Sequence, residues 1–175
     1  MSKHSFLGKM LQDMNTDNYT FVGDTSQIST IIDSFLYLGS QYSTRTDTIS
    51  KRKITHIISI GCDPLYSNLD VTNYKYDIED NGNKNNMTLF FTKVIPEIHE
   101  IMNKCLNQHQ KVLVHCQAGM SRSAIVIITW LMKYQNMDYD KAYKFVKERR
   151  PVISPNISFV EYVKQMKYNN DNDKL

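Results

Sequence analysis

One cysteine and one arginine lie six positions apart in KVLVHCQAGMSRSAIVIITW, residues 111–130. Between Cys116 and Arg122, the small residues Ala118 and Gly119 allow backbone N–H groups to converge on one point. An arginine there offers a planar, two-pronged donor to a tetrahedral oxyanion. Converging amides, a helix N-terminus and a guanidinium lower a cysteine pKa from about 8.5 to roughly 3.5–7.5. The pattern therefore indicates a thiolate in an anion site, and the ligand that fits is a phosphate ester.

The segments on either side of this loop predict how it is positioned. VLVH, residues 112–115, is an apolar β-branched run typical of a buried strand, and residues 121–135 carry a helical pattern. In an open α/β sheet, ligands collect beyond the carboxyl ends of the strands, where a loop leads into a helix. Cys116 occupies that place, and the following helix directs its positive end toward it.

Apolar strands alternate with helices along the rest of the chain, which predicts an α/β fold with a central, mainly parallel sheet and helices on both faces. We expect further strands at residues 34–40, 53–61 and 73–78, and further helices at residues 44–51, 138–149 and 158–168. Another helix should run from Met87, capped by Asn85 or Asn86, to about Leu106, with a break at Pro96 because proline removes a backbone donor.

The 175 residues fit one domain, which we expect at residues 27–168. An N-terminal helix at residues 5–14 and a link to residue 26 should precede it, and a polar tail at residues 169–175 should follow it. A net charge of +3 with scattered Lys and Arg predicts no nucleic-acid partner. The longest apolar run is too short to span a membrane, and the N-terminus has no signal-peptide pattern. We therefore expect a cytoplasmic protein, which could also be nuclear, with reduced cysteines and no metal site.

The loop and its flanks contain the whole signature His-Cys-x5-Arg-Ser. With this signature the chain resembles the cysteine-dependent protein tyrosine phosphatases, and most closely their small dual-specificity branch. FLYLGS, KITHIISIG and ERRPVISPNISF also look like segments of that branch and occur in the same order. The resemblance covers roughly residues 27–168.

The resemblance implies a protein phosphatase that hydrolyses phosphotyrosine and phosphoserine or phosphothreonine through a phosphocysteine intermediate, without metal or cofactor. Cys116 would be the nucleophile, His115 would hold the cysteine loop, and Ser123 would help the thiolate leave. The implied phosphate-binding residues are Gln117, Ala118, Gly119, Met120, Ser121 and Arg122.

A departing alkoxide or phenolate needs a proton, which a carboxylic acid on a separate loop can supply. Asp80 in DIEDNG aligns best with the general acid of the family. The stretch from Asp80 to the next helix looks several residues longer than is usual in the branch, so Asp77 and Glu79 remain alternatives.

Other functions and residue roles stay open. The chain could be a catalytically inactive phosphoprotein-binding module, or a phosphatase for phosphoinositides or RNA 5′ ends, although CQAGMSR contains no lysine for additional phosphates. Phosphoproteins are the expected partners of a monomer or of a dimer formed through the N-terminal helix. Cys62 could be a core thiol or form a disulfide with Cys116. Arg149 and Arg150 could complement a helix dipole or bind a second acidic group on a substrate. Asn156 could bind the cysteine loop or cap a helix.

Overall fold

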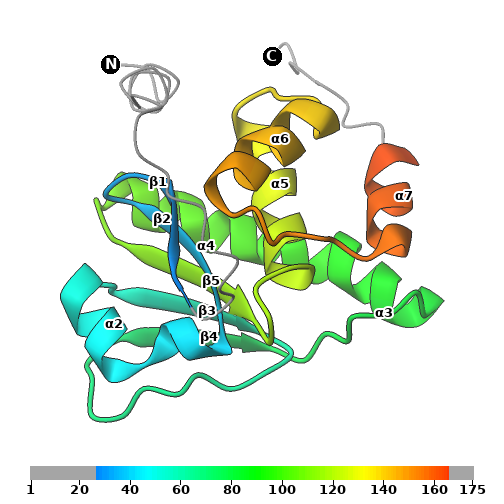
Figure 1. Ribbon diagram of the computed structural model, residues 1–175. Coiled ribbons are helices and arrows are strands. Elements are labelled where there is room, and N and C mark those ends of the chain that lie inside the picture. The colour runs from blue at the N-terminus through cyan, green and yellow to red at the C-terminus, as the bar shows by residue number, and fades with distance from the viewer. Residues whose placement is uncertain (1–26, 166–175) are drawn as a thin grey trace.

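The computed structural model describes residues 27–165 (Figure 1). The N-terminal helix and the polar tail predicted from the sequence lie outside these residues. The elements, in chain order, are β1 (Ser29–Ile32), β2 (Leu36–Ser40), a 3-10 turn (Gln41–Thr44), α2 (Thr46–Arg52), β3 (His56–Ile60), β4 (Thr72–Tyr76), α3 (Lys84–Leu89), a π-helical segment (Phe90–Val94), α4 (Ile95–Asn107), β5 (Val112–Cys116), α5 (Arg122–Tyr134), α6 (Tyr139–Arg149) and α7 (Ile157–Gln165).

The five described strands form one sheet in the order β1-β2-β5-β3-β4. Every neighbouring pair is parallel except β1 and β2, which are antiparallel. β5 is central, and Cys116 at its end pairs in register with Ser40 of β2 and Ile60 of β3. The carboxyl ends of three strands therefore meet where the cysteine lies, as the sequence predicts.

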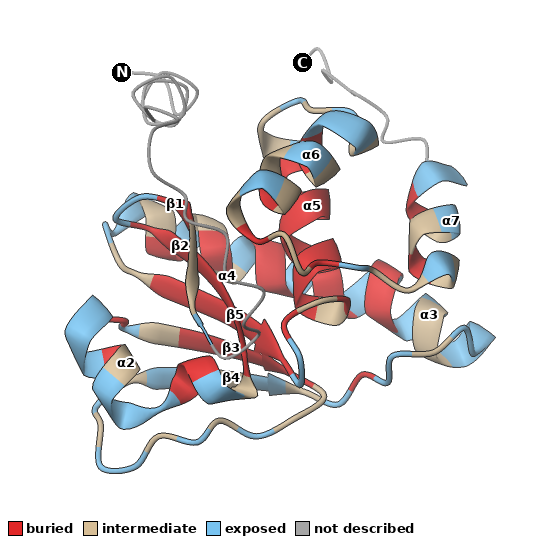
Figure 2. Cartoon of the chain, viewed as in Figure 1, coloured by how far each residue is buried: buried red, intermediate tan, exposed pale blue. Residues whose placement is uncertain are grey.

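Alternate residues of the central strands pack against opposite faces of the sheet, because successive side chains in a strand point to opposite sides. Val112 and Val114 belong to the large core, whereas Leu113 packs with Ile49 of α2 on the other face. Figure 1 shows α2 on one side of the sheet and α4 and α5 on the other, and Figure 2 shows that α5 is buried along most of its length. The expected α/β fold with helices on both faces is confirmed.

The helix after β4 differs from the prediction at its start and in its middle. It begins at Lys84 and not at Met87, because the side chain of Asn83 accepts hydrogen bonds from the amides of Asn85 and Asn86 and caps the first turn. Pro96 does not break the helix either. The preceding turn widens into the π-helical segment, and Pro96 falls in the first turn of α4, where its missing N–H costs little.

The edge strand β1 has no counterpart in the sequence prediction. It has only four residues, and its pairing with β2 contains a register shift between Thr30 and Ile32, so no alternating pattern extends far enough to be recognised. Among the described residues, no helix is both long enough and apolar enough to cross a membrane.

Candidate active site

The loop between β5 and α5 is held from outside by its carbonyl groups. The carbonyl oxygen of Gln117 accepts from the amide of Gln41 at 3.2 Å, and the carbonyl oxygen of Met120 accepts from the amide of Ser154 at 3.0 Å. Between them, the carbonyl oxygens of Ala118 and Gly119 accept from the Arg150 side chain at 3.3 and 2.7 Å. By contrast, no amide from Gln117 to Ser121 donates to a backbone carbonyl of residues 27–165. With its carbonyls bonded to the surrounding structure, the loop can turn its N–H groups toward a common anion.

Gly119 and Arg150 make this loop conformation possible. Gly119 has a φ of 67°, and a side chain there would collide with the carbonyl of Gly39 at the end of β2. The Arg150 side chain is 2% exposed and also donates to the carbonyl of Gln27 at 2.8 Å. One buried guanidinium therefore joins the loop to the start of the described chain.

The Cys116 thiol lies at the base of this loop. Its Sγ is 3.2 Å from Oγ of Ser123, in the first turn of α5. Burial by itself would raise the pKa of Cys116, but hydrogen bonds from the Ser123 side chain and amide, the positive charge of Arg122 and the Gly119 amide together hold that pKa below its ordinary value. The site thus favours a thiolate, as the sequence predicts.

Arg122 begins α5 and is fixed by two carbonyl groups from neighbouring strand ends. Its Nη1 donates to Ile78 O at 2.9 Å and to Gly61 O at 3.4 Å. Its Nε is buried and has no hydrogen-bond partner within the described part of the chain. A buried donor without a hydrogen-bond partner is costly, so an oxyanion ligand that accepts from this nitrogen would be stabilised here.

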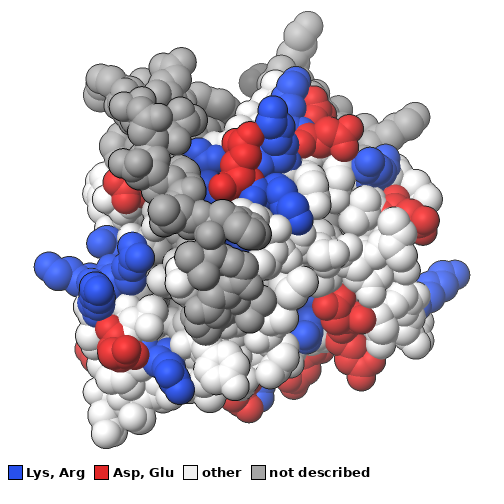
Figure 3. Space-filling model, in the orientation of Figure 1, with Lys and Arg blue, Asp and Glu red and all other residues white. Residues whose placement is uncertain are grey.

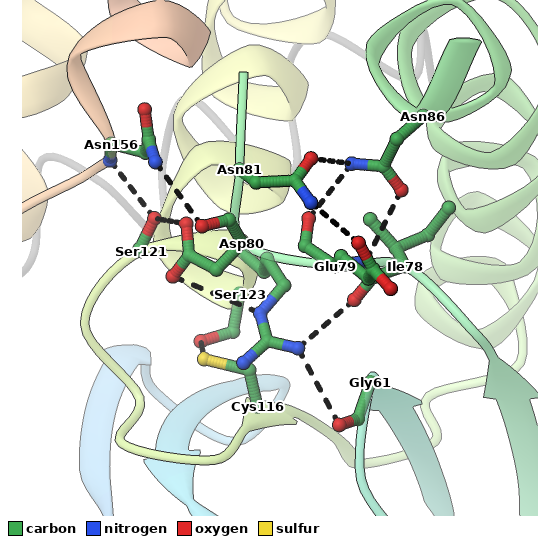
Figure 4. A network of polar contacts seen from close by, with 11 residues as sticks. Gly61, Ile78, Glu79, Asp80, Asn81, Asn86, Cys116, Ser121, Ser123 and Asn156 are labelled. Carbon is green, nitrogen blue, oxygen red and sulfur yellow. Dashed lines mark hydrogen bonds and ion pairs between the residues drawn. The ribbon is translucent and has the colours of Figure 1, made fainter. Parts of the chain in front are cut away.

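The Asp80 carboxylate faces Ser121 and the Arg122 guanidinium from the loop between β4 and α3 (Figure 4). Its Oδ1 accepts from the Ser121 hydroxyl at 2.7 Å, and its Oδ2 is 3.8 Å from Nε of Arg122. Asn156 supports both partners: its amide donates to Ser121 Oγ at 2.9 Å and its side chain donates to the Asp80 carbonyl at 3.3 Å. Asn156 therefore contacts the cysteine loop. Its Oδ1 also accepts from the Ser158 amide at 3.0 Å, in the first turn of α7 (Ile157–Gln165), so it serves in both of the roles considered for it.

The two rival carboxylates lie elsewhere. Figure 4 shows the Glu79 side chain turned toward Asn81, whose amide donates to Glu79 Oε2. Asp77 is exposed and makes no hydrogen bond or ion pair with a site residue among those described. Of the three candidates, only Asp80 places its carboxylate beside Arg122 and the cysteine loop.

His115 precedes the cysteine and is fully buried within the sheet. Its Nε2 is 2.7 Å from the Ser59 hydroxyl, which itself donates to Asn73 Oδ1 at 2.9 Å. Burial lowers the pKa of His115 to about 4, against the opposing effect of a hydrogen bond with the Cys116 backbone. The imidazole is therefore neutral at physiological pH and is suited to holding the backbone in place.

Cys62 lies on the other side of this histidine, with its Sγ 3.7 Å from Nδ1 of His115. Burial and the neighbouring Cys116 sulfur raise the pKa of Cys62 to about 11, so this thiol stays protonated near neutrality. Both cysteines are free thiols in this structure. A disulfide between them stays a prediction.

Two of the supporting residues differ from their predicted roles or were not predicted. Arg150 neither complements the helix dipole nor faces a substrate, because its side chain is buried against the cysteine loop. Arg149 does behave as a helix-terminal residue. Its Cζ lies 3.5 Å from the centre of the Phe145 ring, and its Nη1 donates to the Phe145 carbonyl. Gly61 has a φ of 68°, and a side chain there would collide with the Arg122 guanidinium. The sequence did contain a signal for the role of Gly61, because a glycine directly follows the strand HIISI.

On the face in Figure 3, Lys and Arg side chains are interspersed with Asp and Glu and form no single patch.

Nothing within residues 27–165 groups three or more His, Cys, Asp or Glu side chains in a way that could hold a metal ion. The groups that the site brings together are the Cys116 thiol, the Arg122 guanidinium, the loop amides and the Asp80 carboxyl group.

Comparison with known proteins agrees with this geometry. A sequence model described as "Dual specificity phosphatase, catalytic domain" matches residues 36–169. Dual specificity protein phosphatase 4 of Gallus gallus is 38% identical over 130 residues, 72% of this chain and 33% of the relative. A probable rhodanese domain-containing dual specificity protein phosphatase of Dictyostelium discoideum is 36% identical over 142 residues, 78% of this chain and 28% of the relative.

Among solved structures, a human tyrosine phosphatase-like serine/threonine/tyrosine-interacting protein has a TM-score of 0.68 and 31% identity. The match covers 78% of this chain and 93% of that one. The matched region spans about a third of the length of the curated relatives.

Proposed function

Since the chain belongs to the dual specificity phosphatase family, we propose that it hydrolyses phosphotyrosine and phosphoserine or phosphothreonine in proteins through a phosphocysteine intermediate. One observation carries the proposal. The Arg122 guanidinium, whose buried Nε has no hydrogen-bond partner within the described residues, also supplies positive charge that helps to lower the pKa of the Cys116 thiol. A phosphate monoester dianion would satisfy the guanidinium while presenting its phosphorus to the sulfur.

In the first step, the Cys116 thiolate attacks phosphorus in line with the departing oxygen. The S–P bond forms as the P–O bond to the substrate breaks, and the electron pair of that bond stays on the substrate oxygen. Arg122 and the amides from Gln117 to Arg122 hold the three equatorial oxygens, where charge must be stabilised in the transition state. The outward-bonded carbonyls of the loop support this role, because they hold the loop in shape before substrate arrives.

Asp80 would donate a proton to the departing oxygen and so neutralise the alkoxide or phenolate. Two observations support this assignment over Asp77 and Glu79: the hydrogen bond from Ser121 and the distance of 3.8 Å to Arg122 Nε. A bound phosphate would replace the Asp80 carboxylate as the partner of the Arg122 guanidinium. The hydrogen bond from the Ser121 hydroxyl would then keep the Asp80 carboxyl group near the bound phosphate.

In the second step, a water molecule attacks the phosphocysteine. Its oxygen forms a bond to phosphorus, its proton passes to the Asp80 carboxylate, and the P–S bond breaks with its electron pair returning to sulfur. The Ser123 hydroxyl, 3.2 Å from Sγ, can donate to the departing thiolate and lower the barrier of this step. His115 would hold the start of the loop as a neutral residue.

The proposal is tested by hydrolysis of 4-nitrophenyl phosphate and of phosphotyrosine and phosphothreonine peptides by the purified full chain. We expect turnover that is abolished by Cys116→Ser and retained by Cys105→Ala, a change at a second buried cysteine in α4. Phosphoinositides and 5′-triphosphorylated RNA should be poorer substrates than the peptides, since the loop offers no lysine. Faster release of phosphate from either of these would reassign the substrate class.

A phosphoprotein-binding module without turnover is the second candidate. One observation favours it: the 31% identical human structure is described as phosphatase-like and as an interacting protein. Stoichiometric binding of a phosphopeptide by the unmodified chain with no phosphate release would support this second function. Release of phosphate that requires Cys116 would exclude it. The cytoplasmic or nuclear location and the oligomeric state stay predictions.

A further inference from the structure

The backbone of Glu79, directly before Asp80, is held by a single side chain from helix α3. Asn86 Oδ1 accepts from the Glu79 amide at 3.1 Å, and Asn86 Nδ2 donates to the Glu79 carbonyl at 2.8 Å. An asparagine side chain can make both bonds at once because its amide group contains a donor and an acceptor. Asn86 therefore pairs with Glu79 as a neighbouring strand would.

The same side chain is itself fixed by the start of the helix. Asn86 Nδ2 also lies 3.3 Å from Oδ1 of Asn81, and its backbone amide donates to the capping side chain of Asn83. Figure 4 shows Asn86 and Asn81 on one side of the loop, and Asp80 turned toward Ser121 and Cys116 on the other. The clamp thus joins a capped helix to the backbone on which the carboxylate is mounted.

The residue on the other side of Glu79 is fixed as well. Ile78 is 2% exposed, and its carbonyl accepts from Arg122 Nη1 at 2.9 Å. Past Asp80, no residue is buried before the helix cap: Asn81 is partly exposed, and Gly82 and Asn83 are exposed. The position of Asp80 relative to Arg122 therefore depends on two anchors, the buried Ile78 and the Asn86 clamp.

We propose that Asn86 is a positioning residue for proton donation to the leaving group, acting through the Glu79 backbone on Asp80. This inference rests on the proposed phosphatase function. It predicts a defect confined to substrates that need a proton, because Cys116, Arg122 and the loop amides are untouched when the clamp is lost. A phenyl phosphate needs such a proton, since phenol has a pKa of about 10, whereas a strongly electron-poor aryl phosphate such as 2,4-dinitrophenyl phosphate does not.

The test compares Asn86→Ala with Asn85→Ala in the full chain. Asn85 lies one residue away, is exposed, and its side chain makes no hydrogen bond with residues 27–165, so it is the matched control. For phenyl phosphate, we expect kcat of Asn86→Ala to fall by about tenfold or more, since general acid catalysis contributes roughly 10²–10⁴-fold. With 2,4-dinitrophenyl phosphate, kcat should stay within about twofold of the unmodified chain. Asn85→Ala should match the unmodified chain with both substrates.

A pH profile separates positioning from a general loss of structure. Proton donation by Asp80 requires its protonated form, so kcat for phenyl phosphate should decline on the alkaline side of its profile, and this decline should flatten in Asn86→Ala. Asn86→Asp keeps the size of the side chain and its acceptor but cannot donate to the Glu79 carbonyl, so we expect a change in the same direction. In an Asp80→Asn background, Asn86→Ala should cause almost no further loss, because the group that it positions is already absent.

The possible failures can be told apart. If the unmodified chain hydrolyses neither aryl phosphate, the proposed function is wrong. If the unmodified chain is active and Asn86→Ala loses both substrates equally, or neither, Asn86 does not position the acid and the inference is overturned. Retained turnover of the dinitrophenyl ester also shows that Asn86→Ala is folded, so a selective loss cannot come from unfolding.

Discussion

The Ser121 hydroxyl donates a 2.7 Å hydrogen bond to Oδ1 of Asp80 and so connects the phosphate-binding loop to the loop that carries the acid. The two residues are separated by 41 positions in the chain, and the amide of Asn156 donates to the same hydroxyl. Movement of either loop therefore affects the other.

For Ser121→Ala, we expect the rate on phenyl phosphate to fall by about fivefold to tenfold. A hydrogen bond of about 1 kcal/mol corresponds to such a factor, and this one has a charged acceptor. Ser154→Ala is the control, because its exposed side chain makes no hydrogen bond to any described residue. Steady-state kinetics of the two variants on phenyl phosphate test this prediction. Equal rates would show that the position of Asp80 does not depend on its hydrogen bond with Ser121.

The lowered pKa of Cys116 predicts how its reactivity varies with pH. The thiolate is the reactive form, so the rate of alkylation by iodoacetate should rise as pH increases through the pKa of Cys116, with a midpoint below the ordinary value of about 8.5. Ser123→Ala removes the side-chain hydrogen bond to sulfur, so its midpoint should move to higher pH. An unmodified chain with an ordinary alkaline midpoint would contradict the thiolate assignment.

Arg150→Lys should damage the phosphate loop without touching the phosphate. A lysine has a single ammonium group and cannot reach both Gly119 O and Gln27 O, so loop carbonyls lose their partners. We expect the free energy of unfolding to drop by about 1–3 kcal/mol and vanadate affinity to weaken by roughly tenfold. Urea unfolding and vanadate inhibition measure the two effects. Arg149→Lys should leave vanadate affinity near that of the unmodified chain.

Gly61→Ala should displace Arg122. The positive φ of Gly61 costs a residue with a side chain about 1–3 kcal/mol, and the added methyl group would collide with the Arg122 guanidinium. Because a shift of about 1 Å in a positioning group can cost roughly 10²-fold, we expect kcat/KM for 4-nitrophenyl phosphate to fall by about that factor. An unchanged kcat/KM would show that Arg122 is not held where the structure places it.

Two buried histidines should make the protein less stable in acid. Burial lowers the pKa of His99 and of His115 to about 4, from about 6.5 in the unfolded chain. The unfolded state therefore binds more protons below pH 6.5, and stability is lost as pH falls from about 6.5 toward 4, by about 3 kcal/mol for each histidine when complete.

His99→Gln isolates one of these contributions, because glutamine can still donate to the Val126 carbonyl that His99 contacts at 3.1 Å. Between pH 7 and pH 5, the variant should lose about 2 kcal/mol less stability than the unmodified chain in urea titrations. An equal loss in both proteins would mean that His99 titrates at its ordinary pKa.

The sequence by itself determined the features that depend on short stretches of chain. The apolar run of β5, the small residues of the loop and the start of α5 are contiguous, so the positions of Cys116 and Arg122 at a strand-to-helix junction could be predicted directly. Strands β2 to β5 and most helices follow from periodicity for the same reason, whereas the short edge strand β1 does not. The N-terminus of α3 did not, because several asparagines compete as caps there and only the backbone geometry selects Asn83.

Only the tertiary structure decided which distant residues complete the site. The resemblance to the family favours Asp80, but Asp77, Glu79 and Asp80 are equivalent in charge and almost adjacent in sequence, so the sequence left all three open as the carboxylate that points toward Arg122. Arg150 follows Gly119 by 31 residues, and nothing in its neighbourhood shows that it is buried beneath the loop. Such contacts arise when α6 and the β4–α3 loop pack at the carboxyl end of the sheet, where chain segments far apart in sequence meet and each buried donor must find an acceptor.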